Sequence, residues 1–320
     1  MIGGFCAADV RDFEPSVIIA EAVDDLLAAE IPPRTYVLEP IIPTQGLVML
    51  HAHRGTGKTL IAMAIAYAVA SGSRILRWQA PHARRVLYID GEMPAVVLRD
   101  RFSAIKAGAT ADLPDPDFLR IVTPDRQSVP IPDLALPDGQ LEIERLIEGA
   151  ELVVLDNLSA LCRTGVENDA EYWVPIQSWL LSLRRRGVAV LIVHHSGKGG
   201  QQRGTSKRED LLDTVIGLKR PSDYRPDQGA RFEVHVEKGR AIHGEDAKPF
   251  EVNYAVDAGA AMWTMKSLDD TLTERVADMV SEGLSHREIA KRLSVGVGTV
   301  SRHRRRAKEF GLVTPETTSK

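Results

Sequence analysis

The sequence is poor in cysteine, the residue that stabilises many small secreted and metal-binding domains. Its 320 residues include two cysteines, Cys6 and Cys162, which lie far apart and lack the spacing of metal ligands. Free thiols in a reducing compartment are therefore expected. This scarcity excludes a disulfide scaffold and a zinc finger.

The sequence also lacks a targeting segment and a long hydrophobic run. The N-terminal stretch "MIGGFCAADVRDFEP" has neither the basic start nor the apolar core of a signal peptide. The longest apolar run, "LIAMAIAYAVA", is too short to cross a bilayer. We therefore expect a cytoplasmic protein with no membrane partner.

Charge is distributed unevenly along the chain, although the total is small. A net charge of −4 argues against a protein that binds polyanions over its whole surface. Residues 291–308, in contrast, carry five arginines and no acidic residue. Any affinity for DNA should therefore reside in this segment.

Four apolar runs are typical of continuously buried strands: "GLVMLHA", "RVLYIDG", "AELVVLD" and "VAVLIVHH". Stretches with helical character, such as "TLIAMAIAYAVASG" and "VPIQSWLLSLRRRG", lie between them. Alternation of strands and helices predicts an α/β fold with a mostly parallel sheet covered by helices on both faces.

The pattern divides the chain into three parts. Residues 1–34 form an N-terminal helical arm, because "SVIIAEAVDDLLAAE" reads as an amphipathic helix followed by the breaker "IPPRTY". Residues 35–266 form the α/β domain, and residues 267–320 form a small all-α domain. Within the α/β domain, prolines and aspartates in residues 113–139 predict a surface excursion without regular structure.

The stretch "AHRGTGKT" lies between a predicted strand and a predicted helix, the context of a phosphate-binding loop. Gly55 and Gly57 would let backbone N–H groups close around phosphate oxygens, Lys58 would reach the β- and γ-phosphates, and Thr59 would ligate Mg²⁺. ATP and Mg²⁺ are the expected cofactors. The predicted nucleotide-binding residues are Arg54, Gly55, Thr56, Gly57, Lys58, Thr59 and Leu60.

Ala52 departs from the glycine-rich pattern, which has a glycine at that position. The phosphate cradle is built from residues nearer the lysine, so a methyl group is tolerable there if its φ is negative. A Gly-Lys-Thr turn that arose by chance is the alternative.

Carboxylates follow two of the other predicted strands. Asp156 ends "LVVLD" in the place of a Walker B aspartate that holds Mg²⁺, although apolar runs also end in aspartate by chance. Asp90 and Glu92 follow "VLYI", and Glu92 is the candidate general base for the attacking water. A carboxylate that caps a turn is the alternative for this pair.

His194 and His195 end the last of the four predicted strands. A polar group at this strand end could sense the γ-phosphate. A metal site built on the two histidines is the alternative, but no further cysteine or histidine lies near them in the sequence.

The order "RGTGKT", "YIDGEMP", "LVVLDNLSAL" and "VLIVHHSGK" resembles that of the RecA-like P-loop ATPases. It is most similar to the RepA-type hexameric replicative helicases of plasmids and phages, and the DnaB helicases have a similar Glu-Met-Pro. The resemblance covers residues 35–266. It implies Glu92 as the catalytic base, Asp156 at the metal, and His194 or His195 as the γ-phosphate sensor.

The segment "VEKGRAI" resembles the Lys-x-Arg pair that such helicases insert into a neighbour's ATP site. The resemblance implies a homo-oligomeric ring in which Arg240 is an arginine finger supplied in trans, with Lys238 beside it. A charged face of the alternating strand "FEVHVEKGR" is the alternative for both residues.

The stretch "HHSGKGGQQRGTSKRED" is rich in glycine and basic residues, and its "RGTS" is similar to an Arg-Gly-Ser-Ser segment of the same helicases. In a ring, its basic side chains could face a central channel and follow a single DNA strand. A solvated surface loop is the alternative. The basic residues are Lys198, Arg203, Lys207 and Arg208.

The C-terminal "EIAKRLSVGVGTVSRH" resembles the helix-turn-helix of resolvases and response regulators. Ser285 and Glu288 predict a capping box at the start of its first helix. In the next helix Val300 should pack inward, while a set of polar residues faces outward as in a recognition helix that contacts duplex DNA. That set is Thr299, Ser301, Arg302 and Arg305. A helical hairpin that docks on another protein is the alternative.

These observations favour an ATP-dependent DNA motor, most consistent with a ring-forming replicative helicase. An ATP-switched helix-turn-helix regulator shares every motif except the basic loop and the pair Lys238 and Arg240. A recombination ATPase would share the same core.

Overall fold

The computed structural model describes residues 18–31, 33–165, 170–196 and 210–313. The chain divides into two units, residues 1–34 and residues 35–320. In the first unit the described helix, α1, spans only Val23–Ala28, and Ala22 is its N-cap residue. This helix is shorter than the sequence pattern predicts.

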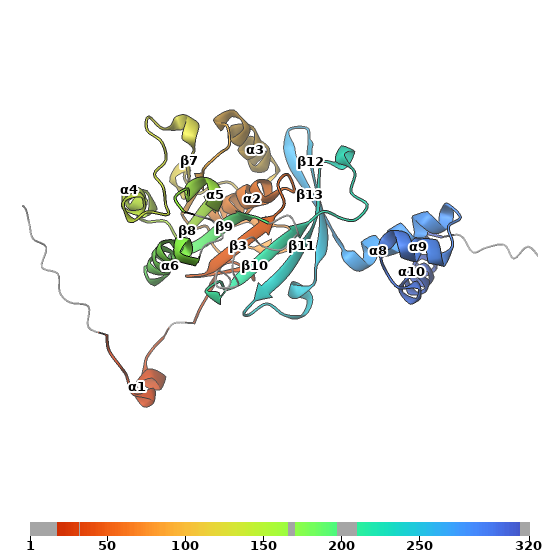
Figure 1. Ribbon diagram of the computed structural model, residues 1–320, viewed down its shortest axis with the longest axis horizontal. Coiled ribbons are helices and arrows are strands. Elements are labelled where there is room, and N and C mark those ends of the chain that lie inside the picture. The colour runs from red at the N-terminus through yellow and green to blue at the C-terminus, as the bar shows by residue number, and fades with distance from the viewer. Residues whose placement is uncertain (1–17, 32, 166–169, 197–209, 314–320) are drawn as a thin grey trace, which may run out of the picture. The chain divides into compact units, whose positions relative to one another are not determined.

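The second unit is organised around a sheet of nine strands (Figure 1). Neighbouring strands run parallel from β10 to β7, and they run antiparallel from β10 to β13. The strands in spatial order are β13 (Ala260–Ser267), β12 (Phe250–Asp257), β11 (Ala230–Gly239), β10 (Thr214–Lys219), β3 (Leu47–Ala52), β9 (Ala189–His195), β8 (Leu152–Asp156), β6 (Val86–Asp90) and β7 (Leu119–Val122).

The four strands predicted from apolar runs are β3, β6, β8 and β9, which lie side by side in the parallel part. Their residues are buried along nearly their whole length, as expected for strands covered on both faces. The predicted α/β class with a mostly parallel sheet is therefore confirmed. Two small hairpins accompany the sheet: β1 (Tyr36–Leu38) with β2 (Ile42–Pro43), and β4 (Arg74–Ile75) with β5 (Trp78–Gln79).

The prediction of irregular structure across residues 113–139 is wrong in part. Strand β7 lies within this segment and pairs in parallel with β6 at the edge of the sheet. Its burial is incomplete, so it lacks the continuous apolar run that marks the central strands. The 3₁₀ helices η1 (Pro116–Phe118) and η2 (Pro124–Arg126), whose first residues are the prolines, flank the strand on either side.

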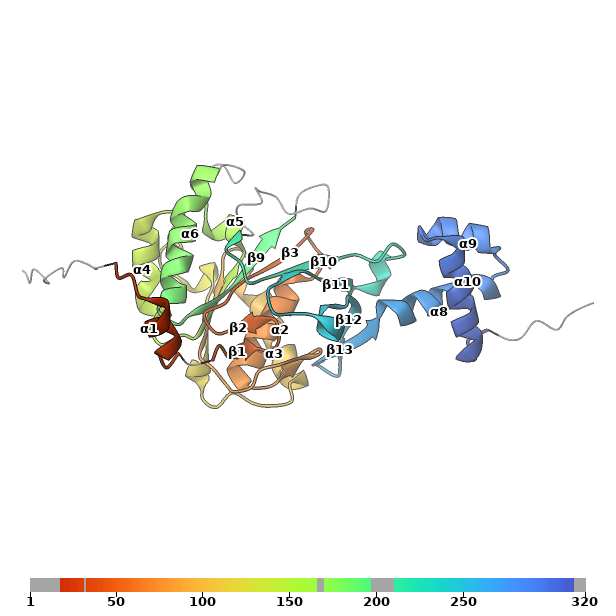
Figure 2. The same ribbon diagram turned by 90° about the horizontal axis from the view of Figure 1, so that it is seen from below.

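Helices cover both faces of the sheet (Figure 2). On one face α2 (Lys58–Ser71) and α3 (Ala95–Gly108) pack against a core that includes Val48 and Leu50 of β3. On the other face α4 (Pro137–Ile147), α5 (Leu158–Leu161) and α6 (Ala170–Arg185) pack against Leu47 and Met49. Successive residues of β3 thus enter different cores, because side chains alternate along a strand.

The chain ends in three short helices, α8 (Leu268–Ser281), α9 (His286–Leu293) and α10 (Val297–Glu309). The predicted capping box is present, since the side chains of Ser285 and Glu288 each accept a bond from the other's backbone N–H. Val276, Ile289 and Val300 are among the residues that form a small core between the helices.

Two further 3₁₀ helices, η3 (Pro226–Gln228) and η4 (Gly244–Ala247), lie in the connections of the antiparallel part. None of the helices in the described part of the chain is long and apolar enough to cross a membrane.

Candidate functional site

A cavity of about 470 Å³ lies beside the predicted phosphate loop. It brings together residues from four separate parts of the sequence that lie at the ends of β3, β6, β8 and β9. The expected site residues that line it are Arg54, Gly55, Gly57, Lys58, Thr59, Leu60, Glu92, Asp156 and His195. Thr56 does not line it and instead donates its hydroxyl hydrogen to the carbonyl of His53 at 3.0 Å.

The loop backbone accommodates the unusual Ala52. This residue is the last of β3, is buried, and pairs with His195 of β9 in ordinary strand register. The left-handed conformations belong to Gly55 and Gly57, with φ of 74° and 122°. At Gly57 a Cβ atom would also lie 2.9 Å from the Phe232 ring, so both conformation and space require glycine there.

Lys58 is held by the loop that precedes it. Its Nζ donates to the carbonyls of Ala52 at 3.0 Å and of His53 at 2.9 Å, which uses two of its three N–H donors. Burial lowers the pKa of Lys58 to about 8, and the negative charges of Asp156 and Glu92 act against this fall. The loop therefore presents a positioned, partly desolvated ammonium group at the start of α2, where the helix dipole also favours anions.

Asp156 occupies the end of β8 and is contacted from two sides. Its Oδ1 accepts a hydrogen bond from the Thr59 hydroxyl at 3.3 Å, and its Oδ2 accepts one from the Tyr88 hydroxyl at 2.5 Å. Burial raises the pKa of Asp156, although both hydrogen bonds oppose that change. Sequence analysis did not identify Tyr88, whose only signal was a polar tip within a buried strand.

The two carboxylates after β6 lie in different environments. Asp90 is buried, and its Oδ2 accepts the backbone N–H of Met93 at 2.8 Å, so it holds the turn that follows the strand. Burial raises the pKa of Asp90 to about 7. Glu92 lines the cavity itself. Asp90 therefore caps the turn, and Glu92 is the carboxylate of the pair that lies at the cavity.

The histidines at the end of β9 lie on opposite faces of the sheet. His195 lines the cavity, whereas His194 is fully buried and pairs in register with His51 of β3. Opposite faces are expected for consecutive residues of a strand. Of the two sensor candidates, His195 is thus the one at the cavity.

Lys238 and Arg240 do not line this cavity. The Arg240 guanidinium donates to the carbonyl of Asp210 at 2.9 Å, and Lys238 Nζ lies 3.5 Å from the same oxygen. The four basic residues predicted to follow a DNA strand are outside the described part of the chain. They are Lys198, Arg203, Lys207 and Arg208.

Several residues at the site were not anticipated from the sequence. Arg101 of α3 lines the cavity, and its guanidinium lies 3.2 Å from the sulfur of Met93. Arg220 donates to the carbonyl of Gly55 at 2.9 Å and so supports the phosphate loop from β10's far end. Neither arginine belongs to a local motif, because each reaches the site from a segment distant in sequence from the phosphate loop.

A second cavity, of about 810 Å³, adjoins the first and shares Leu60, Arg101 and Ala230 with it. Val256 and Tyr254 also line this space, and the Tyr254 ring lies 4.7 Å from that of Trp263. The adjoining cavity thus presents apolar and aromatic surface next to a phosphate-binding loop.

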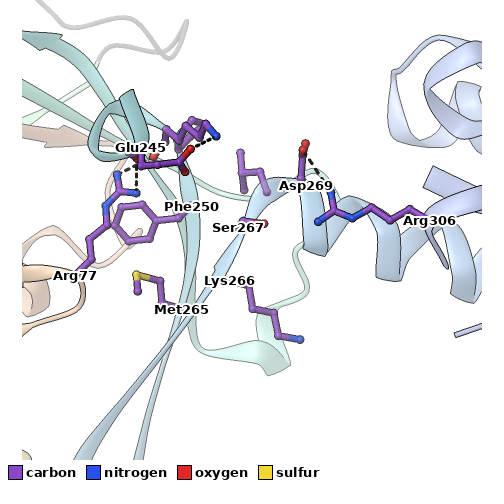
Figure 3. Close-up of a pocket in the computed structure, with 11 residues that line it drawn as sticks. Arg77, Glu245, Phe250, Met265, Lys266, Ser267, Asp269 and Arg306 are labelled. Carbon is purple, nitrogen blue, oxygen red and sulfur yellow. Dashed lines mark hydrogen bonds and ion pairs between the residues drawn. The ribbon is translucent and has the colours of Figure 1, made fainter. Parts of the chain in front are cut away.

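Another cavity, of about 530 Å³, lies between the antiparallel strands and the C-terminal helices (Figure 3). Arg77 donates there to the carbonyls of Glu245, Asp246 and Lys248. Arg306 pairs with Asp270 at 2.7 Å. These cations are already paired within the chain, so this space makes a poor anion site.

The predicted outward face of α10 is exposed for Ser301, Arg302 and Arg305, and Thr299 is half-buried. Val300 points into the small core, as expected. His303, which had no predicted role, is buried, and its Nδ1 lies 2.9 Å from the hydroxyl oxygen of Thr273 in α8.

A family model described as an AAA domain matches residues 13–201, which is more than half of the chain. The chain belongs to this AAA domain family. The crystal structure of a KaiC-like protein from the hyperthermophilic archaeon Pyrococcus horikoshii OT3 is similar at 15% identity and a TM-score of 0.47. That match covers 71% of this chain and 93% of the other.

Membership of the AAA domain family fits the geometry of the phosphate-loop cavity. The strand–loop–helix arrangement around Gly55, Gly57 and Lys58 is the part of such domains that binds nucleotide phosphates. The protein is therefore a nucleotide-binding P-loop ATPase with an α/β domain built on a mostly parallel sheet.

Proposed function

We propose that the protein is an ATP-dependent DNA motor, a ring-forming replicative helicase that couples ATP hydrolysis to unwinding or translocation. One observation carries the proposal: Lys58, Glu92 and His195 meet in one cavity with Thr59 and Asp156, from four distant sequence motifs. These four motifs, in this order, also carry the resemblance of the sequence to the RepA-type replicative helicases.

The residues present fit a nucleotide with its magnesium ion. The Thr59 hydroxyl and the Asp156 carboxylate, joined at 3.3 Å, supply the oxygen ligands that Mg²⁺ prefers. When bound, the ion neutralises negative charge on phosphate oxygens. Lys58 and the backbone N–H groups at Gly55 and Gly57 hold the phosphates. The apolar cavity around Tyr254 suits the nucleoside.

Hydrolysis requires a base and added positive charge. Glu92 faces the cavity and accepts the proton of the attacking water, while His195 contacts the phosphate that is released. Arg240 binds the carbonyl of Asp210 rather than its own subunit's cavity. Neither Lys238 nor Arg240 lines the cavity of its own chain, so we assign both residues to the site of a neighbouring subunit in a ring, as the resemblance implies.

The proposed DNA contacts lie in two parts of the chain. The exposed Ser301, Arg302 and Arg305 of α10 bind duplex DNA, with the half-buried Thr299 at the same surface. The basic segment that contains Lys198 follows a single strand through the ring. Four arginines in α10 favour any phosphate backbone, so they supply affinity without defining a sequence.

The test is steady-state ATP hydrolysis by the purified protein while single-stranded DNA is titrated in, with duplex DNA of the same composition as the comparison. A motor predicts strong stimulation by the single strand. Slow hydrolysis that is indifferent to single strands would contradict the helicase proposal.

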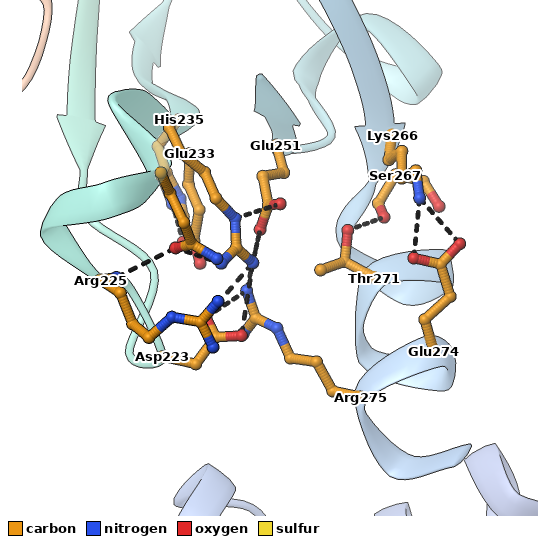
Figure 4. A network of polar contacts seen from close by, with 12 residues as sticks. Asp223, Arg225, Glu233, His235, Glu251, Lys266, Ser267, Thr271, Glu274 and Arg275 are labelled. Atoms are coloured by element: carbon orange, nitrogen blue, oxygen red, sulfur yellow. Dashed lines mark hydrogen bonds and ion pairs between the residues drawn. The ribbon is translucent and has the colours of Figure 1, made fainter. Parts of the chain in front are cut away.

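One observation favours a second candidate, an ATP-switched DNA-binding regulator. Arg275 of α8 pairs with Glu251 of β12 at 2.8 Å and with Asp223 at 2.9 Å, and Arg231 of β11 also pairs with Glu251 at 2.8 Å (Figure 4). A change in the ATPase sheet would reach the C-terminal helices through this network. Tight binding to particular duplexes that changes with ATP, without stimulation by single strands, would favour the regulator.

A further inference from the structure

His51 of β3 is a buried histidine that joins two other strands. Its Nδ1 lies 2.8 Å from the Ser196 hydroxyl oxygen, and its Nε2 lies 2.8 Å from Oε2 of Glu237. Ser196 directly follows β9, and Glu237 belongs to β11. We name these three residues, Ser196, His51 and Glu237, the polar relay.

The polar relay crosses β10, which lies between β3 and β11. The contact between His51 and Glu237 lies directly over Gly217 of β10. A Cβ atom at this position would lie 2.5 Å from Oε1 of Glu237 and 3.2 Å from Nε2 of His51. A glycine within a strand often marks such a close approach. Any side chain at this position would separate Glu237 from His51.

An irregularity in β11 supports the same contact. Val215 of β10 pairs with Lys238 and the next residue, Ile216, pairs with Val236, so Glu237 is the extra residue of a β-bulge. A bulge re-aims a side chain relative to a regular strand. The glycine in β10 and the bulge in β11 thus both permit the contact between His51 and Glu237. Two such features at one contact would be unexpected if the contact were incidental.

Glu237 carries the negative charge of the relay. The hydrogen bond from His51, together with Lys219 at 3.1 Å, lowers the pKa of Glu237 to about 2. A neutral imidazole that donates from Nε2 to this carboxylate accepts at Nδ1, so the Ser196 hydroxyl donates to it. Ser196 and His51 are both buried and neither lines the nucleotide cavity, which excludes them from direct contact with the nucleotide there.

The two ends of the relay adjoin residues of the proposed ATPase mechanism. Ser196 follows His195, which lines the cavity, and its backbone N–H bonds to the carbonyl of Ala52 at 2.9 Å. Glu237 precedes Lys238 and is three residues before Arg240. The relay therefore connects the phosphate-sensing end of β9 with the strand that carries the proposed finger.

We propose that His51 is a positioning residue that sets the place of Lys238 and Arg240 according to the state of the nucleotide at His195. Movement of the β9 end shifts Ser196, and the paired imidazole passes that shift to Glu237, because breaking either buried bond would leave a polar group unsatisfied. The inference rests on the proposed role of Arg240 at a neighbour's site, and it adds the residue that coordinates that role with the subunit's own site.

The test compares kcat and KM for ATP in the full-length protein and in His51→Leu. If His51→Leu mispositions Arg240, we expect kcat to fall about 10- to 100-fold. KM and the affinity for a fluorescent ATP analogue should change less than about twofold. The matched control is His235→Leu. His235 also pairs with a glutamate, Glu233 at 2.9 Å, but only within β11, so this variant should hydrolyse ATP normally.

Gly217→Ala is the second variant, because His51→Leu could simply fold poorly. It keeps every polar group but displaces the Glu237 carboxylate from His51, so it should lower kcat in the same direction in a protein that stays folded at the assay temperature. Wild-type kcat in both variants would overturn the proposal. So would a loss of kcat that only follows loss of folded protein or of ATP affinity.

A double variant separates this inference from the proposed function. If His51 acts through Arg240, then His51→Leu combined with Arg240→Ala should be no slower than Arg240→Ala alone. Multiplied effects would overturn the relay while leaving the finger intact. A normal rate in Arg240→Ala alone would instead show that the proposed finger has failed.

Discussion

The parallel and antiparallel parts of the sheet use charge in different ways. In the parallel part the strand ends place Lys58, Asp156 and Asp90 in buried positions, and burial shifts the pKa of each. In the antiparallel part Arg231 and Glu251 are also largely buried, but they form direct ion pairs. The first arrangement keeps charge available for a ligand, whereas the second satisfies it within the chain.

This difference follows from topology. The carboxyl ends of parallel strands lie at one edge of the sheet, so residues far apart in sequence converge at that edge. Antiparallel strands bring their side chains into direct cross-strand contact, where opposite charges pair. We therefore assign the nucleotide site to the parallel part, and we assign coupling between sites to the antiparallel part, which carries Arg240 directly after β11. Variants in each part test that division.

The largest effect is expected for Lys58→Ala, which removes the ammonium group at the phosphate loop. ATP turnover should fall by at least about 10³-fold, since the substitution removes an ammonium group that the carbonyls of Ala52 and His53 position beside the transferred phosphate. Hydrolysis measured at saturating ATP checks this. The control is Lys106→Ala, an exposed lysine of α3; persistence of turnover in Lys58→Ala would refute the assignment.

Arg240→Ala tests whether the antiparallel part supplies a finger to a neighbour. Alone it should lower kcat by about 10³-fold or more, as expected for an arginine finger. Mixed with the Lys58→Ala protein, it should recover turnover, because some subunits then join an intact site to an intact finger. If mixtures stay inactive at every ratio, Arg240 is not a finger supplied in trans, and it instead belongs to the charged surface of its strand.

Glu92→Gln separates binding from chemistry within the parallel part. Loss of the base should lower kcat by at least about 10²-fold, while ATP affinity is preserved because the phosphate loop is untouched. Single-turnover hydrolysis and equilibrium binding of an ATP analogue measure the two quantities. Glu142→Gln in α4 is the exposed control. Normal hydrolysis by Glu92→Gln would remove this residue from the mechanism.

The pH dependence of ATP binding provides a smaller effect with a defined sign. The pKa of Lys58 is about 8, so below this pH the free protein carries the ammonium group that the phosphates require. Above it, binding must first protonate the lysine, and affinity should fall about tenfold per pH unit. Binding measured from pH 7 to pH 9.5 tests this. Lys58→Arg should give a flat profile, because guanidinium stays charged.

The smallest effect concerns the connection between the antiparallel part and α8. Arg275→Ala should lower the free energy of unfolding by about 1–2 kcal/mol, because it leaves the largely buried Glu251 with one partner fewer. Lys266→Ala removes an exposed pair with Glu274 and should cost less than about 1 kcal/mol. Denaturant unfolding measures both, and equal effects would contradict the role assigned to burial.

Local patterns predicted much of the site. The strands β3, β6, β8 and β9 were visible as apolar runs, and the residues after them, including Glu92, Asp156 and His195, do meet in one cavity. Strand β7 was missed because an edge strand that is half exposed has no continuous apolar run. The apolar run did not show which of His194 and His195 lies at the cavity. Alternation of side chains along β9 places His195 at the cavity and His194 on the other face of the sheet.

Residues that act across distance had no sequence signal. Arg101 reaches the cavity and Arg220 reaches the phosphate loop from other elements, and Tyr88 reaches Asp156 from the adjacent strand. The polar relay of Ser196, His51 and Glu237 depends on strand register, on a bulge and on one glycine. None of these is a property of a short stretch of sequence.

The sequence by itself determined the fold class and the phosphate loop, because hydrophobic periodicity and glycine conformation act over a few neighbouring residues. Tertiary structure alone decided which charges remain available and which are paired. It set the buried state of Lys58 and the pairing of Arg275 with Glu251. Charge depends on solvent exposure and on neighbours through space, and both exist only once the strands have assembled.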